Sequence, residues 1–257
     1  MPQRARAAIA FVVLFSLYQS AEGIGDRVLH SFAAQATLMT ACVVAAWPLS
    51  RWLGFRGYGA WALDARPAGF GWLGVGLALA LSAKAMALWI GVRMGIYVAS
   101  PGVVPQPAAM IASALPMLLL STFVPSIAED ILARGFWYRG AGIAWRRGIA
   151  FVAFSSLAYV ANHIFRLDLG APEWTMLACF GIAYATALWR TGTLWAAVGL
   201  HWGWNLGNHL ADAMVPLDIA DPVASPLLSA TIHLVLAGVF LLLVRGAPRR
   251  AQGVASA

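Results

Sequence analysis

Long apolar runs separated by short polar gaps are the feature that most constrains what this chain can fold into. Hydrophobic residues make up 61% of the sequence and charged residues 11%, whereas soluble domains average about 25% charged residues. Because the deficit of charge extends over the whole length, it predicts an all-α, polytopic transmembrane bundle rather than a globular domain with one anchor. About eight spans of about 20 residues each are expected, at 7–22, 29–49, 69–92, 107–128, 149–165, 172–189, 192–210 and 226–244.

Arginines fall mainly in the gaps on one predicted side of the membrane. Cytoplasmic loops are enriched in positive residues, so the pattern predicts that both chain ends are cytoplasmic. The net charge of +7 is therefore interpreted as a topology signal, and no nucleic-acid partner is expected. With the N-terminus inside, the cytoplasmic segments contain Arg4, Arg6, Arg51, Arg56, Arg66, Arg134, Arg139, Arg146, Arg147, Arg190, Arg245, Arg249 and Arg250, and the opposite side contains Arg27, Arg93 and Arg166.

The domain organisation is expected to be simple. The first apolar run resembles a secretory signal, but no convincing small-x-small cleavage site follows it and further spans do, so it is interpreted as an uncleaved first helix. Cys42 and Cys179 both lie inside apolar runs, which argues against a disulfide framework. The sequence contains no linker long enough to separate domains. One integral membrane domain is therefore expected over residues 1–257.

Polar side chains within the apolar runs are the candidates for function, because ionisable groups inside a membrane are rare and usually functional. The clearest are Glu129, His163 and His201. Along ideal helices Glu129 lies about 15 Å from Arg139, His201 about 16 Å from Arg190 and His163 about 24 Å from Arg147. All three depths fall within a hydrocarbon core about 30 Å thick. The polar groups of three separate helices are therefore expected to meet at one depth.

The spacing of these residues predicts which of them face a common cavity. Asp130 and Arg134 are four residues apart, so they can pair on one helix face. Glu129 points about 100° away from Asp130 on the same helix and is left free to face the cavity. His201 and Asn205 are also four residues apart and present one polar edge.

The chemistry of this set is that of amide hydrolysis. A carboxylate and a histidine around one buried water make a general-base site. A second histidine with an asparagine supplies hydrogen-bond donors where an oxyanion would develop.

At these positions the chain resembles the CPBP intramembrane proteases, which include the type II CAAX prenyl endopeptidases and bacterial bacteriocin-processing or self-immunity relatives. The stretch EDILAR at 129–134 resembles the family motif Glu-Glu-x-x-x-Arg. The stretch YVANH at 159–163 resembles Phe-x-x-x-His, and HWGWN at 201–205 matches His-x-x-x-Asn. The similarity covers residues 107–210, the protease-like core, and the expected span count fits the family's usual architecture.

The resemblance implies an intramembrane endopeptidase that cleaves a membrane-associated protein or peptide. The family is described both as metalloproteases and as glutamate-dependent enzymes without a metal. This chain has no His-Glu-x-x-His pair, and two histidines with a glutamate suit zinc only if they converge, so no cofactor is expected. The alternative is zinc bound by Glu129, His163 and His201. By resemblance, Glu129 and His163 activate the water, His201 and Asn205 stabilise the oxyanion, and Asp130 and Arg134 support the motif helix.

Two positions depart from the family pattern. Asp130 replaces a glutamate and shortens the reach of the second acid by one methylene. This leaves activity intact if the acid only pairs with Arg134, and puts activity in doubt if the acid touches substrate or water. Tyr159 replaces a phenylalanine and adds a hydroxyl that needs a partner.

Each candidate also has a plainer interpretation. The acidic motif would be a solvated helix end if the fourth span stopped near Pro125, and His201 with Asn205 would be interhelical packing contacts. Lys84 is unexplained: it snorkels, pairs with an acid or lines a polar vestibule.

The main alternative function is a catalytically degenerate membrane partner, such as an immunity or assembly factor. A proton-coupled carrier would need inverted repeats, which are not found. The chain is expected in a bacterial inner membrane, with a peptide or protein substrate and the lipid bilayer as partners.

Overall fold

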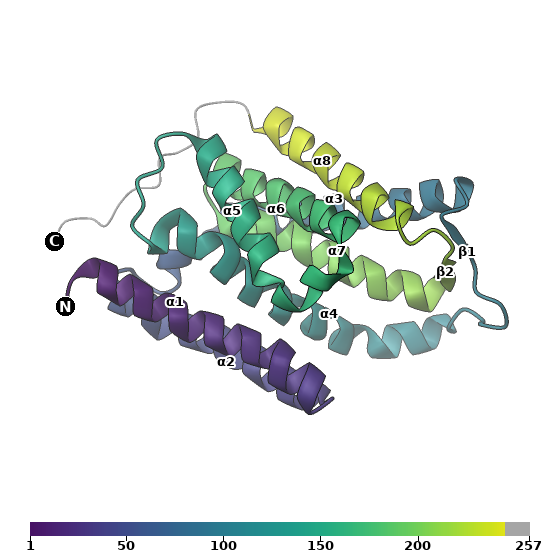
Figure 1. Cartoon of the computed structure of the whole chain (residues 1–257), viewed down its shortest axis with the longest axis horizontal. Coiled ribbons are helices and arrows are strands. Elements are labelled where there is room, and N and C mark those ends of the chain that lie inside the picture. The colour runs from purple at the N-terminus through teal and green to yellow at the C-terminus, as the bar shows by residue number, and fades with distance from the viewer. Residues whose placement is uncertain (245–257) are drawn as a thin grey trace.

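The computed structural model describes residues 1–244 and shows a bundle of long helices (Figure 1). Arg245, Arg249 and Arg250, which the topology prediction used, lie outside the described residues. The long helices are α1 (Gln3–Ser20), α2 (Phe32–Trp52), α3 (Pro67–Arg93), α4 (Ala108–Asp130), α5 (Gly148–Asn162), α6 (Ala171–Thr191), α7 (Leu194–Met214) and α8 (Ala224–Leu243).

Each long helix corresponds to one expected span, so the prediction of an all-α membrane bundle is confirmed. Within residues 1–244, 5 helical segments are both long and apolar enough to cross a membrane. They contain α1, α2, α3, α4 and α8. Helix α5 is apolar but shorter, with 15 residues, and α7 carries His201 and Asn205 of the candidate site. The chain is therefore an integral membrane protein.

Segments predicted to be cytoplasmic meet at one end of the bundle. Arg6 donates a hydrogen bond to the Trp52 carbonyl at 3.0 Å, and Arg139 donates one to the Gly59 carbonyl at 2.9 Å. Arg134 is the exception, because its side chain is fully buried. It was counted among the cytoplasmic arginines, and that assignment is wrong: its charge is matched by Asp130 inside the bundle. The orientation of the bundle in a membrane stays a prediction.

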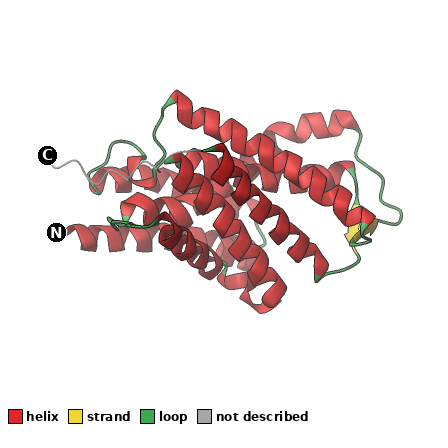
Figure 2. Ribbon diagram, turned by 90° about the horizontal axis from the view of Figure 1, so that it is seen from above, coloured by secondary structure: helices red, strands yellow, loops and turns green. Residues whose placement is uncertain are grey.

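The opposite end carries the short strands. Strand β1 (Tyr97–Ala99) follows α3, and β2 (Leu217–Ile219) follows α7. The two pair antiparallel, with Val98 opposite Asp218, and Figure 2 shows them in yellow beyond the helix ends. This pairing ties the loops after α3 and α7 together.

Helices α3 and α7 pack with their backbones in close approach. A Cβ atom on Gly76 would lie 2.7 Å from the Ala196 carbonyl oxygen, and one on Gly199 would lie 2.3 Å from the Leu73 carbonyl oxygen. No side chain fits at either position. Small residues are the usual means of bringing membrane helices together, and here they hold the helix that bears His201 firmly against α3.

The fourth span continues past the acidic motif instead of ending at Pro125. Helix α4 contains Pro125 and passes directly into a π-helix, η3 (Ile131–Gly140). Such π-helical turns are frequent at functional sites. Helix α5, by contrast, ends at Asn162, earlier than the expected span end at 165. His163 follows with φ −88° and ψ 50°, so it lies at a helix end where its side chain can turn inward.

Candidate active site

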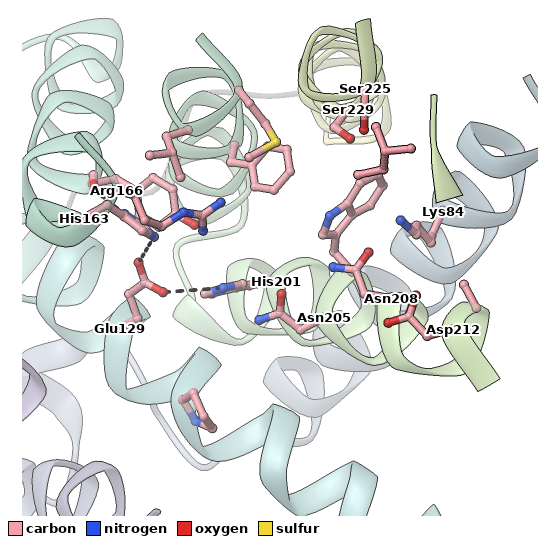
Figure 3. Close-up of a pocket in the computed structure, with 18 of the residues that line it drawn as sticks. Lys84, Glu129, His163, Arg166, His201, Asn205, Asn208, Asp212, Ser225 and Ser229 are labelled. Carbon is pink, nitrogen blue, oxygen red and sulfur yellow. Dashed lines mark hydrogen bonds and ion pairs between the residues drawn. The ribbon is translucent and has the colours of Figure 1, made fainter. Parts of the chain in front are cut away.

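Glu129 lies at the point where three helices bring their polar side chains together (Figure 3). Its Oε1 atom is 3.3 Å from His163 Nε2, and its Oε2 atom is 3.6 Å from His201 Nε2. Glu129 is 6% exposed, His163 5% and His201 4%. One carboxylate from α4 therefore lies between a histidine that follows α5 and a histidine of α7, and all three side chains are buried on the cavity wall.

The backbone sets the tautomer of His163. Its Nδ1 atom lies 2.8 Å from the Tyr159 carbonyl oxygen, which can only accept a hydrogen bond, so Nδ1 carries the proton. In the neutral ring, Nε2 is then an acceptor that faces another acceptor, the Glu129 carboxylate. Two acceptors at this distance are stabilised by a proton between them. The pair is thus arranged to take up and release one proton.

Asp130 and Arg134 form a buried ion pair beside the cavity. Both side chains are fully buried, and Asp130 Oδ1 pairs with Arg134 Nη1 one helical turn on. The same carboxylate oxygen is 3.5 Å from His201 Nδ1. Neither Asp130 nor Arg134 is among the residues that line the cavity. The aspartate contacts the groups that hold the site and does not face the cavity itself.

Two aromatic rings cover the Arg134 guanidinium. Its central carbon lies 4.2 Å from the centroid of Tyr159 and 4.8 Å from that of Tyr184, which are distances of cation–π contacts. The Tyr159 ring also meets His163 edge-on, with centroids 4.6 Å apart. Among residues 1–244 the Tyr159 hydroxyl has no hydrogen-bond partner, and Tyr159 lines the cavity. Its ring therefore serves the packing role expected of a phenylalanine at this position.

Asn205 is held by α4. Its side-chain nitrogen donates to Ser126 Oγ at 3.1 Å, and the Ser126 hydroxyl donates to the Thr122 carbonyl at 2.7 Å. The amide has two N–H groups, so one can bind α4 while the other is available to the cavity that Asn205 lines. Sequence reasoning missed Ser126, although its position three residues before Glu129 places both near the same face of α4.

The site opens into a cavity of about 590 Å³. Besides Glu129 and both histidines, it is lined from α1 by Tyr18, from α3 by Lys84 and from β2 by Leu217. The expectation was a cavity between the helices that bear the motifs. The observed cavity is larger and extends from Glu129 towards the β1–β2 end of the bundle.

A protein-family model matches residues 111–207, and its description is "Type II CAAX prenyl endopeptidase Rce1-like". The match contains the whole candidate site, from Ser126 to Asn205. This segment is similar to the CAAX-type membrane protease family. Neither curated proteins nor solved structures include a match to the chain.

The matched segment, residues 111–207, lies within the range 107–210 expected for the protease-like core. It does not contain every wall of the cavity. Tyr18 of α1 and Lys84 of α3 lie before it, and Leu217 lies after it. The cavity wall is therefore built from residues inside and outside the matched segment.

The described residues contain no zinc-site arrangement. No group of three or more histidine, cysteine, aspartate or glutamate side chains has a metal-binding arrangement in residues 1–244. Each histidine approaches a different oxygen of Glu129.

Helix α6 supplies an aromatic side chain that sequence reasoning missed. The Tyr184 hydroxyl donates to His233 Nε2 at 3.0 Å, and His233 Nδ1 donates to the Ser229 carbonyl at 2.8 Å. His233 stacks on Phe180, with ring centroids 3.5 Å apart. A tyrosine in an apolar helix is usually a packing residue. The only indication in the sequence that Tyr184 has a buried polar partner is His233 in the apolar run of α8.

Proposed function

We propose that this protein is a glutamate-type intramembrane endopeptidase that hydrolyses a peptide bond in a membrane-associated protein or peptide. The contact of Glu129 with both His163 and His201, on the wall of a cavity, carries the proposal. A buried carboxylate beside a histidine is a general base, and similarity to the family provides the reaction class. The proposed location is a bacterial inner membrane.

In the proposed reaction Glu129 and His163 act as one unit. A water beside them attacks the carbonyl carbon of the scissile peptide, and its proton passes to the pair. The carbonyl oxygen becomes an oxyanion, which accepts hydrogen bonds from Asn205 and His201. Collapse of the intermediate breaks the C–N bond, and the pair returns the proton to the leaving amine. The products are a new carboxyl terminus and a peptide with a free amine.

The proposed mechanism uses no metal. Its support is the pairwise contact of Glu129 with each histidine and the absence of a three-ligand arrangement among the described residues. If zinc were used instead, Glu129, His163 and His201 would be its ligands and would polarise the peptide carbonyl through it. A strong chelator separates the two mechanisms.

The test is cleavage of peptides by the purified protein in lipid nanodiscs, followed by mass spectrometry. The substrates are a quenched peptide library and peptides ending in Cys-aliphatic-aliphatic-X, with and without a prenyl group on the cysteine. Glu129→Gln and His163→Ala are expected to lower kcat/KM by at least about 100-fold, the usual loss when a general base is removed. His209→Ala is the matched control, because His209 is an exposed histidine of the same bundle.

Cleavage that resists the chelator and is lost in Glu129→Gln supports the glutamate-type mechanism. Cleavage abolished by the chelator and restored by zinc would replace it with the metal mechanism. A folded wild-type protein that cleaves none of these peptides would favour the alternative of a catalytically degenerate membrane partner.

A further inference from the structure

Glu22 is an acid on the cavity wall that the proposed reaction does not use. It lies in the first helical segment, Gln3–Val28, which is long and apolar enough to cross a membrane. Its Oε1 atom accepts a hydrogen bond of 3.1 Å from the buried Tyr18 hydroxyl. No ion pair involves Glu22 in the described part of the chain. Charged groups within a membrane normally pair or serve a function, so this carboxylate is a candidate for binding a cation.

The backbone around Glu22 is closely packed. Helix α1 passes without a break into a π-helix, η1 (Ala21–Val28), and Glu22 is its second residue. Such π-helical turns are frequent at functional sites. A Cβ atom on Gly25 would lie 2.8 Å from the backbone nitrogen of Gln35, so η1 packs directly on the first turn of α2. The acid therefore lies on a well-supported part of the cavity wall.

Two contacts hold this part of the wall against the segment that carries His163. Gln19, three residues before Glu22, donates a hydrogen bond of 2.7 Å to the carbonyl of Asn162. The glycine that follows Glu22 would place a Cβ atom 2.9 Å from Phe165 Cζ. The two contacts thus lie on either side of His163 in one segment and on either side of Glu22 in the other. They place Glu22 at the end of the cavity where Glu129 meets His163, which is called the reacting end below.

The arginines on either side of the reacting end do not neutralise Glu22. Arg166 lines the cavity beside His163 (Figure 3), and its ion pair is with Glu173. Arg27, on the same π-helix as Glu22, is exposed and donates to a backbone carbonyl. The reacting end therefore has an acid for which the described residues supply no paired cation.

We propose that Glu22 binds a cationic group of the substrate close to the scissile bond. The group is the side chain of a basic residue or a free amino terminus, since both present N–H donors and a positive charge to a carboxylate. The Tyr18 hydroxyl orients one carboxylate oxygen of Glu22, and the other accepts no hydrogen bond within residues 1–244. This inference rests on the proposed peptidase function and names a substrate class for it.

The test measures peptide binding rather than cleavage. The probes are acetylated apolar heptapeptides with a C-terminal fluorophore, in which lysine or norleucine occupies each position in turn. Binding to the Glu129→Gln variant, in nanodiscs of phosphatidylcholine, is followed by fluorescence anisotropy. At one or more positions lysine is expected to bind about tenfold more tightly than norleucine, as a charge-assisted hydrogen bond provides.

Glu22→Gln is expected to abolish the preference for lysine. Tyr18→Phe is expected to keep it, because this change removes the hydroxyl that orients the carboxylate and leaves the charge in place. Asp26→Asn is the matched control, since Asp26 is an exposed acid of the same π-helix and does not line the cavity.

A norleucine peptide with a free amino terminus separates the two sources of the cation. If it binds as tightly as the best lysine peptide, Glu22 accepts any ammonium group at the reacting end. If it binds as weakly as the acetylated norleucine peptide, Glu22 selects a basic side chain.

Three results would overturn the proposal. The first is equal binding of lysine and norleucine peptides at every position by the Glu129→Gln variant. The second is equal weakening of both peptides when Glu22→Gln is added, which would mean that the acid supports the fold. The third is an equal loss of the preference in Asp26→Asn, which would mean that surface charge attracts the lysine. Binding is measured without turnover, so these results are independent of the cleavage test of the peptidase function.

Discussion

The Tyr184 ring stacks on the His201 imidazole, with centroids 5.2 Å apart and planes inclined by 22°. The same ring covers the Arg134 guanidinium, and its hydroxyl binds His233. Helix α6, which carries none of the three motifs, thus contacts the candidate oxyanion histidine and the arginine of the acidic motif. The orientation of His201 depends on a helix that lies between α5, α7 and α8.

Tyr184→Leu is expected to lower kcat of peptide cleavage by about tenfold. The stacked Tyr184 ring holds His201 in its orientation, and such an aromatic pair is worth about 0.5–1.5 kcal/mol. KM should change little, since Tyr184 does not line the cavity. Tyr184→Phe keeps the stack and removes only the hydrogen bond to His233, so its loss should be smaller. The measurement is steady-state cleavage by the two variants. A larger defect in Tyr184→Phe would mean that the hydroxyl, and not the stack, is what His201 requires.

The buried pair of Asp130 and Arg134 makes a prediction about stability. Arg134→Met alone leaves the Asp130 carboxylate without its partner, and removal of one member of a buried ion pair costs about 3–5 kcal/mol. Replacing both residues, as in Asp130→Asn with Arg134→Met, removes the unpaired charge and should recover much of that loss. Thermal unfolding of the two variants in the same lipid mimic provides the comparison. A double variant that is no more stable than the single one would contradict it.

Much of this fold could be predicted because a backbone N–H or C=O group without a hydrogen bond is costly in lipid. An apolar run of sufficient length must be a helix, and the polar side chains that interrupt such runs had to meet. The positions of Glu129, His163 and His201 followed from that constraint together with the helical period. The pairing of Asp130 with Arg134, rather than with solvent, followed from their spacing of four residues.

The parts of the site that could not be predicted depend on residue types that are common in apolar helices. Tyr184 and Ser126 are common residues in membrane spans, and only their contacts with His201 and Asn205 distinguish them. The contribution of Tyr18 to the cavity wall depends on how α1 packs, which no local pattern encodes. Arg134 was assigned to the cytoplasm because a sequence-based count cannot separate a loop arginine from a buried one.

Ser126→Ala tests whether α4 positions Asn205. The variant removes the hydroxyl that accepts the Asn205 N–H bond, so the amide becomes free to rotate away from the oxyanion. Removal of a direct oxyanion donor lowers kcat by about 100-fold or more. The hydrogen bond from Asn205 to Ser126 acts only by orienting such a donor, so the expected fall in kcat is about tenfold or less. Ser113→Ala is the control, since Ser113 is an exposed serine of the same helix that binds only the Met110 carbonyl. Equal activity of the two variants would show that Asn205 keeps its orientation without Ser126.

Gly199→Ala tests the close packing that holds α7 against α3. The added methyl would lie 2.3 Å from the Leu73 carbonyl oxygen, and because that atom is backbone, one helix has to move. Overpacking of this kind costs about 1–3 kcal/mol, and the shift also displaces His201, two residues further along α7. The unfolding temperature and the cleavage rate should therefore fall together. Gly74→Ala on α3 is the matched control, because nothing lies within 4 Å of its added methyl. If Gly199→Ala is as stable and active as this control, α3 and α7 can move apart without loss of stability or activity.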